Sequence, residues 1–184
     1  MDDKTALVVI DTQRGMFETP GVPPVPDGER LLGNNEGLIE RAREAGTTVI
    51  HIRRDGGPGQ ALERGTGRGW PIHPRVAPAA GEPVVDKEAS DSSLHTTLQD
   101  ELDTRGMARQ VLAGMQTEYC VDTACRRAFG LGYDDVTLTA DARGTRDEET
   151  LLAAQIIAHH NEVMGNGFAA APPAEISFRE PVSA

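Results

Sequence analysis

The chain has 184 residues, which suits one domain, and its 18 Lys and Arg against 29 Asp and Glu give a formal net charge of −11. So acidic a chain lacks the clustered basic side chains that nucleic acids and anionic membranes require, and we expect neither as a partner. No apolar run approaches the ~18–20 residues of a membrane span. The start of the chain lacks the basic and apolar segments of a secretory signal, so a cytoplasmic location is expected.

Short apolar runs alternate with stretches of helical periodicity along the whole chain. The predicted strands are residues 6–10, 47–52, 84–87, 110–114 and 136–140, with a weakly signalled last strand near 176–178. The predicted helices are residues 31–45, 96–104, 120–131 and 148–161. Strands and helices in alternation indicate βαβ units, so we predict a three-layer α/β/α sandwich with a central, mostly parallel sheet. One domain is expected over residues 1–184.

Residues 53–81 form a long segment rich in Gly, Pro and charge, with no sustained period. A loop of this length is uncommon in a compact domain unless it builds a site, so we predict an active-site wall or lid. Trp70 in this loop is either a pocket wall or a packing anchor, and the sequence fits both. Four arginines of the segment either meet a substrate carboxylate or offset the acidic surface: Arg53, Arg54, Arg64 and Arg68.

Three chemically distinct groups fall at the carboxyl ends of predicted strands. Asp11 follows the first strand, Lys87 ends the third, and Cys120 follows the fourth after a Gly-led turn. Ligands of parallel sheets bind beyond the carboxyl ends of the strands, so we expect these side chains to meet at one edge. An ammonium group and a helix N-terminus both stabilise a thiolate, and a carboxylate can accept the thiol proton. The set is suited to acyl transfer through a thioester, with backbone amides holding the oxyanion.

The residues around these groups resemble the signature blocks of isochorismatase-like hydrolases. The blocks are Ile10-Asp11-Thr12-Gln13, the Lys87-x-x-x-Asp91-Ser92 stretch, and the segment from Gly114 to Thr123. The resemblance covers roughly residues 5 to 165. It implies a triad of Cys120, Asp11 and Lys87, an oxyanion hole from the backbone amides of Gln116 and Cys120, and a cis peptide between Met115 and Gln116.

Departures from the family pattern narrow the implied activity. Nicotinamidases of the family have an Asp-x-His metal motif after the second strand, and residues 51–57 here lack it. Isochorismatases proper cleave a vinyl ether and lack the nucleophilic cysteine that this chain has at position 120. The resemblance therefore implies hydrolysis of a small-molecule C–N bond (amide, lactam or ureido), in the branch that includes streptothricin hydrolases. Cleavage of another bond, such as a vinyl ether, and a non-catalytic binding role remain open.

Further positions receive provisional roles. Gln13 and Phe17 follow the first strand closely, and with Trp70 and Tyr119 they are candidates for substrate binding. Cys125 is expected to be a core residue. No metal and no cofactor are predicted, and the partner is a small-molecule substrate. Relatives of the family are commonly dimers or tetramers, so a homo-oligomer is expected.

Overall fold

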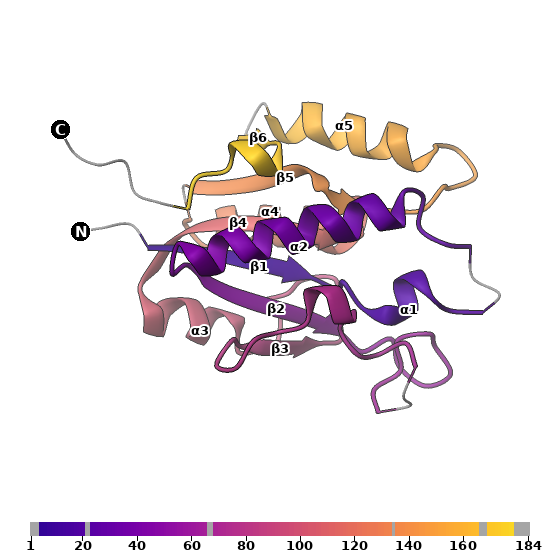
Figure 1. Cartoon of the computed structure of the whole chain (residues 1–184), viewed down its shortest axis with the longest axis horizontal. Helices are drawn as coiled ribbons and strands as arrows, with labels where there is room; N and C mark the ends of the chain where they lie inside the picture. Colours follow the sequence, from indigo (N-terminus) through magenta and orange to yellow (C-terminus); the bar gives the residue numbers. More distant parts are fainter. Residues whose placement is uncertain (1–3, 21–22, 66–67, 134, 166–168, 179–184) are drawn as a thin grey trace.

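A six-stranded sheet forms the centre of the computed structural model, which describes residues 4–20, 23–65, 68–133, 135–165 and 169–178 (Figure 1). The strand order is β3-β2-β1-β4-β5-β6, and each neighbouring pair is parallel. The strands are β1 (Lys4–Ile10), β2 (Thr48–Arg54), β3 (Val84–Lys87), β4 (Met107–Met115), β5 (Asp135–Gly144) and β6 (Ala169–Ala171).

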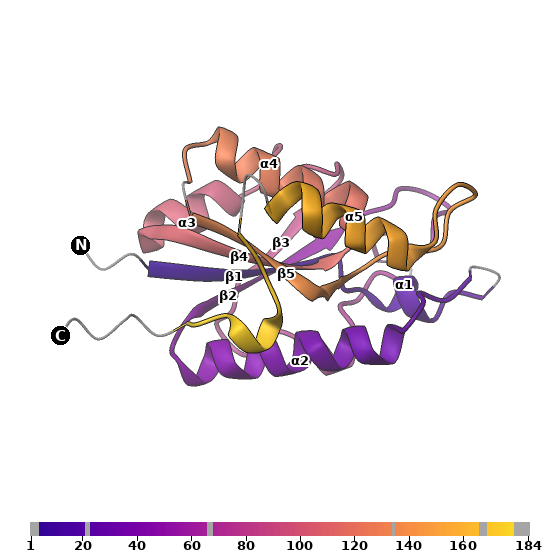
Figure 2. The ribbon, with the colours of Figure 1, turned by 90° about the horizontal axis from the view of Figure 1, so that it is seen from above.

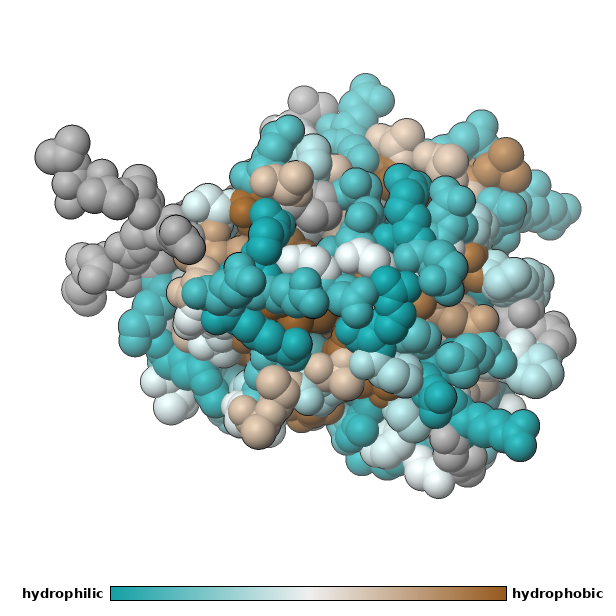
Figure 3. All heavy atoms as spheres, viewed as in Figure 1, coloured by the Kyte–Doolittle hydropathy of each residue, from teal (hydrophilic) through white to brown (hydrophobic). Residues whose placement is uncertain are grey.

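Helices cover both faces of the sheet. They are α1 (Arg14–Phe17), α2 (Gly28–Glu44), α3 (Leu98–Arg105), α4 (Asp122–Gly130) and α5 (Ala153–Gly165), with short turns η1 (Pro74–Val76), η2 (Thr117–Val121) and η3 (Pro173–Glu175). Helix α2 lies against one face, and α3, α4 and α5 lie against the other (Figure 2). The outer surface on the α2 side is dominated by hydrophilic side chains (Figure 3). None of the helices in the described ranges is long and apolar enough to cross a membrane.

The central strand β1 is buried on both faces, as its continuous apolar run predicted. Leu7 and Val9 pack into one core cluster with Leu38 and Ile39 of α2. The alternate residues Ala6, Val8 and Ile10 pack into the other cluster, which holds apolar residues of α3, α4 and α5. The two faces of one strand therefore join the three layers.

The predicted fold class is confirmed, with three differences at the level of elements. The last strand is residues 169–171, and the predicted strand at residues 176–178 is wrong because that segment only packs apolar side chains against the core. The helix predicted from residue 120 begins as the π-helical turn η2 and becomes α-helical at Asp122. The four-residue helix α1 was not predicted, since one turn gives no periodic signal.

The chain order of the sheet creates its switch point between β1 and β4, where a ligand site is expected. Gly114 of β4 lies opposite Ile10 of β1 and has φ of 109°, a conformation that glycine alone adopts readily. A Cβ at Gly114 would overlap the Ile10 carbonyl oxygen. Glycine at position 114 is therefore required for the close approach of β4 to β1 at the edge where a ligand site is expected.

The long loop after β2 is attached to the segment after β1 by a run of backbone contacts. Gln13 forms an antiparallel bridge with Ile72, and the Arg14 and Gly15 amides donate to the carbonyls of Pro71 and Gly69 at 2.9 and 2.8 Å. A Cβ at Gly69 would overlap the carbonyl of Ala61. The long loop predicted to form an active-site wall is thus fixed, through backbone hydrogen bonds, to the segment that follows β1.

A second attachment joins the end of that segment to the sheet. The Glu82 carboxylate accepts hydrogen bonds from Arg43 Nε and Nη2 at 2.7 and 2.8 Å and from the Ala79 amide, and it pairs with Nε2 of buried His51 at 2.9 Å. These donors outweigh the cost of burial and lower the pKa of Glu82 to about 2. His51 is therefore a paired core residue of β2.

Replacing Gly114 by alanine tests the close approach of β4 to β1. We expect a loss of ~3 kcal/mol or more of unfolding free energy, because the overlap is with backbone that cannot move aside. For a chain of this size the melting temperature should fall by roughly 6–12 °C. Gly37→Ala is the control: Gly37 lies in α2, and no atom beyond its own helix backbone comes within 4 Å of the place its Cβ would take, so alanine there should be neutral or stabilising. Equal effects of the two substitutions would contradict the interpretation.

The Glu82 contacts predict a specific acid sensitivity. Because the folded-state pKa of Glu82 is about 2 against an ordinary 4.5, its contribution is fully present above pH ~4.5 and is lost as the pH falls towards 2. Denaturant titrations of the wild type and Glu82→Gln over this range measure it. The difference in unfolding free energy between the two should shrink as the pH falls, and a constant difference would rule the contribution out.

Candidate active site

Asp11 stands immediately after β1, at the switch point of the sheet. Its backbone adopts φ of 49°, and its amide donates to the Ile52 carbonyl of β2 at 3.0 Å. The residue is only 2% exposed, so its carboxylate is held in the protein interior. A buried charge needs a partner, and the structure supplies one from β3.

Lys87 is that partner. It ends β3 and is 2% exposed, and its Nζ lies 3.0 Å from Asp11 Oδ2. The same ammonium donates to the Ser90 carbonyl at 3.1 Å and to Ser92 Oγ at 3.3 Å. Although acids flank it in the sequence at Asp86 and Glu88, Lys87 is therefore not a solvated surface charge.

Cys120 lies in η2, the π-helical turn between β4 and α4, and is 5% exposed. The Met115–Gln116 peptide that precedes the turn is cis, as the resemblance implied. The Gln116 carbonyl accepts from the amides of Tyr119 and Val121 at 3.2 and 3.1 Å. These bonds fix the turn, and with it the position of the sulfur.

The three side chains form one electrostatic unit. Burial raises the pKa of Asp11, while the Lys87 ammonium and a hydrogen bond with the Cys120 thiol act in the opposite direction. Burial and the Asp11 charge raise the pKa of Cys120, and Lys87 offsets this only in part. We expected a stabilised thiolate from the sequence; instead desolvation is the largest influence, and it raises the pKa of both the thiol and the carboxyl.

A cavity of about 450 Å³ opens beside this unit. Asp11 and Cys120 line it, as do Gln116 and Tyr119, and Tyr119 is 49% exposed at its surface. The remaining lining residues are Gly15, Met16, Arg54, Gly56, Gln60, Ala61, Leu62, Ser90, Met115 and Arg146. The long loop after β2 thus supplies part of the wall, at residues 56 and 60–62.

Three of the predicted substrate-binding residues lie outside the lining of this cavity. Gln13 is fully buried, and its side chain bonds the backbone of Arg54 and the Trp70 carbonyl. The Trp70 ring lies 3.5 Å under the Arg53 guanidinium, which makes it a packing anchor of the loop. Phe17 packs against a core cluster and meets the His73 ring edge-on. Each of these three side chains therefore packs outside the cavity and supports the segments that form its wall.

No sequence pattern singled out Arg146 or Thr145, and Arg54 had two possible roles. Arg54 Nη1 lies 3.5 Å from the sulfur of Cys120. Thr145 donates to Glu118 at 2.6 Å and accepts from Gln116 Nε2 at 3.4 Å, which braces the turn from β5. The only available signal was position, since Thr145 and Arg146 follow the fifth strand. Cys125 is 0% exposed, and burial raises its pKa to about 12.

Metal ligation has no evident place in the described part of the chain. Within those ranges no group of three or more His, Cys, Asp or Glu side chains is arranged to hold a metal ion. Cys120 and Asp11 instead meet an ammonium and a guanidinium. The charged groups that face the thiol and the carboxylate are therefore basic side chains.

The fold and this edge define a parallel α/β/α protein whose site holds an acid, an amine and a thiol at the switch point of the sheet. The family model described as Isochorismatase domain matches residues 5–163, so the chain belongs to the isochorismatase family of hydrolases. The resemblance inferred from the three sequence blocks is thereby confirmed.

Individual relatives agree with this assignment. A streptothricin hydrolase from Streptomyces noursei is 37% identical over 142 residues, which cover 77% of this chain and 50% of that protein. A maleamate amidohydrolase from Pseudomonas putida is 29% identical over 150 residues, covering 73% of this chain and 70% of that protein. The solved structure of an isochorismatase from Pseudomonas putida superimposes with a TM-score of 0.86 at 28% identity, over 95% of this chain and 91% of the other. The chain spans about half the length of the streptothricin hydrolases it matches.

Removing the ammonium of Lys87 should lower the free energy of unfolding and favour the neutral form of Asp11. Lys87→Met leaves a buried carboxylate unpaired, which typically costs ~3–5 kcal/mol, and thermal or denaturant unfolding measures the loss. The pKa of Asp11 should rise further, since Lys87 is the largest influence that lowers it.

The double variant Asp11→Asn/Lys87→Met is the control for this pair. Its destabilisation should be clearly smaller than the sum of the two single effects, because the double variant leaves no unpaired charge. Additive effects would show that the two side chains do not depend on each other.

Proposed function

We propose that the chain is a cysteine hydrolase that cleaves a small-molecule C–N bond of amide, lactam or ureido type through a thioester. Cys120 is the nucleophile, Asp11 the proton acceptor and Lys87 the group that holds Asp11 ionised and oriented. The observation that carries the proposal is the burial of these three interacting groups beside a cavity of about 450 Å³.

The reaction follows from the protonation states. As the sulfur attacks the carbonyl carbon, the thiol proton passes to Asp11, and the backbone amides of Gln116 and Cys120 hold the developing oxyanion. Asp11 then gives the proton to the nitrogen, the C–N bond breaks, and ammonia or an amine leaves. Water attacks the thioester, Asp11 takes its proton, and release of the acid returns the proton to sulfur.

The raised pKa values of both Cys120 and Asp11 fit this cycle. A thiol that rests protonated needs an adjacent base at the moment of attack, and a desolvated carboxylate is a stronger base than a solvated one. The Lys87 ammonium acts against burial and lowers the pKa of Asp11, which favours the ionised carboxylate that the proposed step needs. The relative named maleamate amidohydrolase supports an amide as the bond cleaved.

Two other functions remain as alternatives. Hydrolysis of another bond, such as a vinyl ether, would release no nitrogen product. A non-catalytic binding member of the fold would use the cavity alone, and its affinity for ligand would survive loss of the sulfur.

The test is release of ammonia or amine from a panel of small amides, lactams and ureido compounds. Cys120→Ala should lower kcat/KM by at least about 10⁴-fold, because the covalent step has no substitute. Cys125→Ala is the matched control, since it removes the other thiol of the chain, and it should retain activity within a few-fold. Turnover by Cys120→Ala at the wild-type rate, or hydrolysis without any nitrogen product, would refute the proposal.

A further inference from the structure

The cavity beside Cys120 is cationic although the chain as a whole is acidic. Its lining includes one acid, Asp11, and two arginines, Arg54 and Arg146. Lys87 offsets the charge of Asp11 at 3.0 Å. Among the described residues, neither guanidinium has a carboxylate partner of its own at the cavity wall, in a chain with a net charge of −11.

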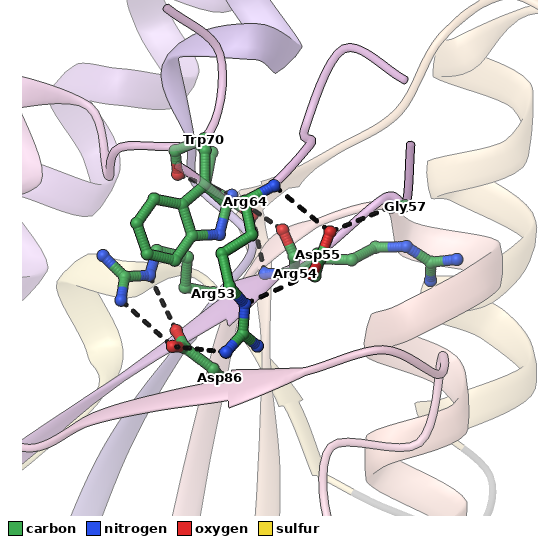
Figure 4. A network of polar contacts seen from close by, with 8 residues as sticks. Arg53, Arg54, Asp55, Gly57, Arg64, Trp70 and Asp86 are labelled. Atoms are coloured by element: carbon green, nitrogen blue, oxygen red, sulfur yellow. Dashed lines mark hydrogen bonds and ion pairs between the residues drawn. The ribbon is translucent and has the colours of Figure 1, made fainter. Parts of the chain in front are cut away.

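Arg54 reaches the cavity from the end of β2 and differs from the neighbouring arginines in its contacts. Its neighbour Arg53 is paired with Asp86, and Arg64 is paired with Asp55. Figure 4 shows the Arg54 side chain extending away from this network. Within the described ranges no carboxylate oxygen lies within 4 Å of its guanidinium, whereas Nη1 lies 3.5 Å from Cys120 Sγ.

Arg146 reaches the same cavity from the segment after β5. Its Nη2 donates to the Met16 carbonyl at 3.0 Å, and its Nε is buried without a hydrogen-bond acceptor in the described part of the structure. Burial lowers the pKa of Arg146, and no acid in the described part of the chain acts against it. A desolvated guanidinium with unused donors is costly unless a ligand supplies the acceptor.

We propose that Arg54 and Arg146 make this cavity a subsite for an anion, and that the substrates are amide-type compounds that carry a carboxylate close to the scissile carbonyl. The planar fork of a guanidinium matches the two oxygens of a carboxylate. The 3.5 Å contact of Arg54 with the sulfur places that carboxylate near the carbon under attack. This inference rests on the proposed function, because it names the substrate class of the same site.

The test compares two alkylating reagents at the same sulfur, iodoacetate and iodoacetamide, which differ chiefly in charge. Peptide mapping by mass spectrometry gives the rate constant of each at Cys120. The thiolate fraction cancels in the ratio of the two rate constants, so the ratio reports only how the cavity treats the charge of the reagent. The reference is the same ratio for N-acetylcysteine in the same buffer.

The wild-type ratio of iodoacetate to iodoacetamide should exceed the reference by about fivefold or more, since a cation a few ångströms away attracts the anionic reagent. Arg146→Gln and Arg54→Gln should each move the ratio back towards the reference, and Arg146→Lys, which keeps the charge, should restore most of it. Arg68→Gln makes the same change in net charge on an exposed part of the loop, outside the cavity lining, and should leave the ratio unchanged.

A wild-type ratio equal to the reference would overturn the inference, as would an equal response to Arg68→Gln and Arg146→Gln. The outcome is separate from that of the proposed function. Ammonia release with no preference for the anionic reagent would refute the carboxylate subsite and leave the proposed hydrolase activity standing. A preference for iodoacetate without any turnover of the panel would support the anion subsite and refute the proposed hydrolase activity. In the positive case, succinamate should be hydrolysed in preference to its methyl ester, and Arg146→Gln should reduce that preference.

Discussion

The ion pair between Lys87 and Asp11 is the contact on which the chemistry of the site depends. It joins the ends of β1 and β3, two strands separated by β2, and both partners are almost fully withdrawn from water. Burial raises the pKa of the Asp11 carboxyl, and the ammonium is the largest influence in the opposite direction. With it, a carboxylate of raised basicity stands beside a thiol. Burial and this one pair of charges thus act together on the pKa values of Asp11 and Cys120.

Other contacts position the Cys120 sulfur and the cavity wall next to that ion pair. Gly114 lets β4 approach β1, and the turn that follows places Cys120 beside Asp11. Gln13, two residues after Asp11, bonds the backbone at Arg54 and at Trp70, and so fixes both ends of the loop segment that walls the cavity. The Asp11 carboxyl, the Cys120 thiol and the cavity wall are therefore all positioned by contacts with the end of β1.

The sequence predicted strands β1 to β5 and helices α2 to α5. It also predicted that residues 11, 87 and 120 meet, because the carboxyl ends of parallel strands lie at a common edge of the sheet. The sequence did not predict the roles of residues whose contacts come from tertiary packing. Gln13 and Trp70 look like pocket residues by position, and only the folded loop shows that Gln13 binds backbone groups and that Trp70 stacks on a neighbouring guanidinium. Arg54 sits among similar arginines, and the pairing of Arg53 and Arg64 is what sets it apart. The dominance of burial over charge at the sulfur likewise needs the surroundings of the thiol.

The backbone contacts of Gly15, Gly69 and Ala61 limit how the site can diversify. No side chain fits at either glycine, so the base of the cavity wall keeps one shape whatever ligand is selected. Variation in ligand preference is left to solvent-facing positions at the cavity mouth, such as Gln60 and Tyr119. A library that randomises those two residues would alter selectivity while leaving the scaffold intact.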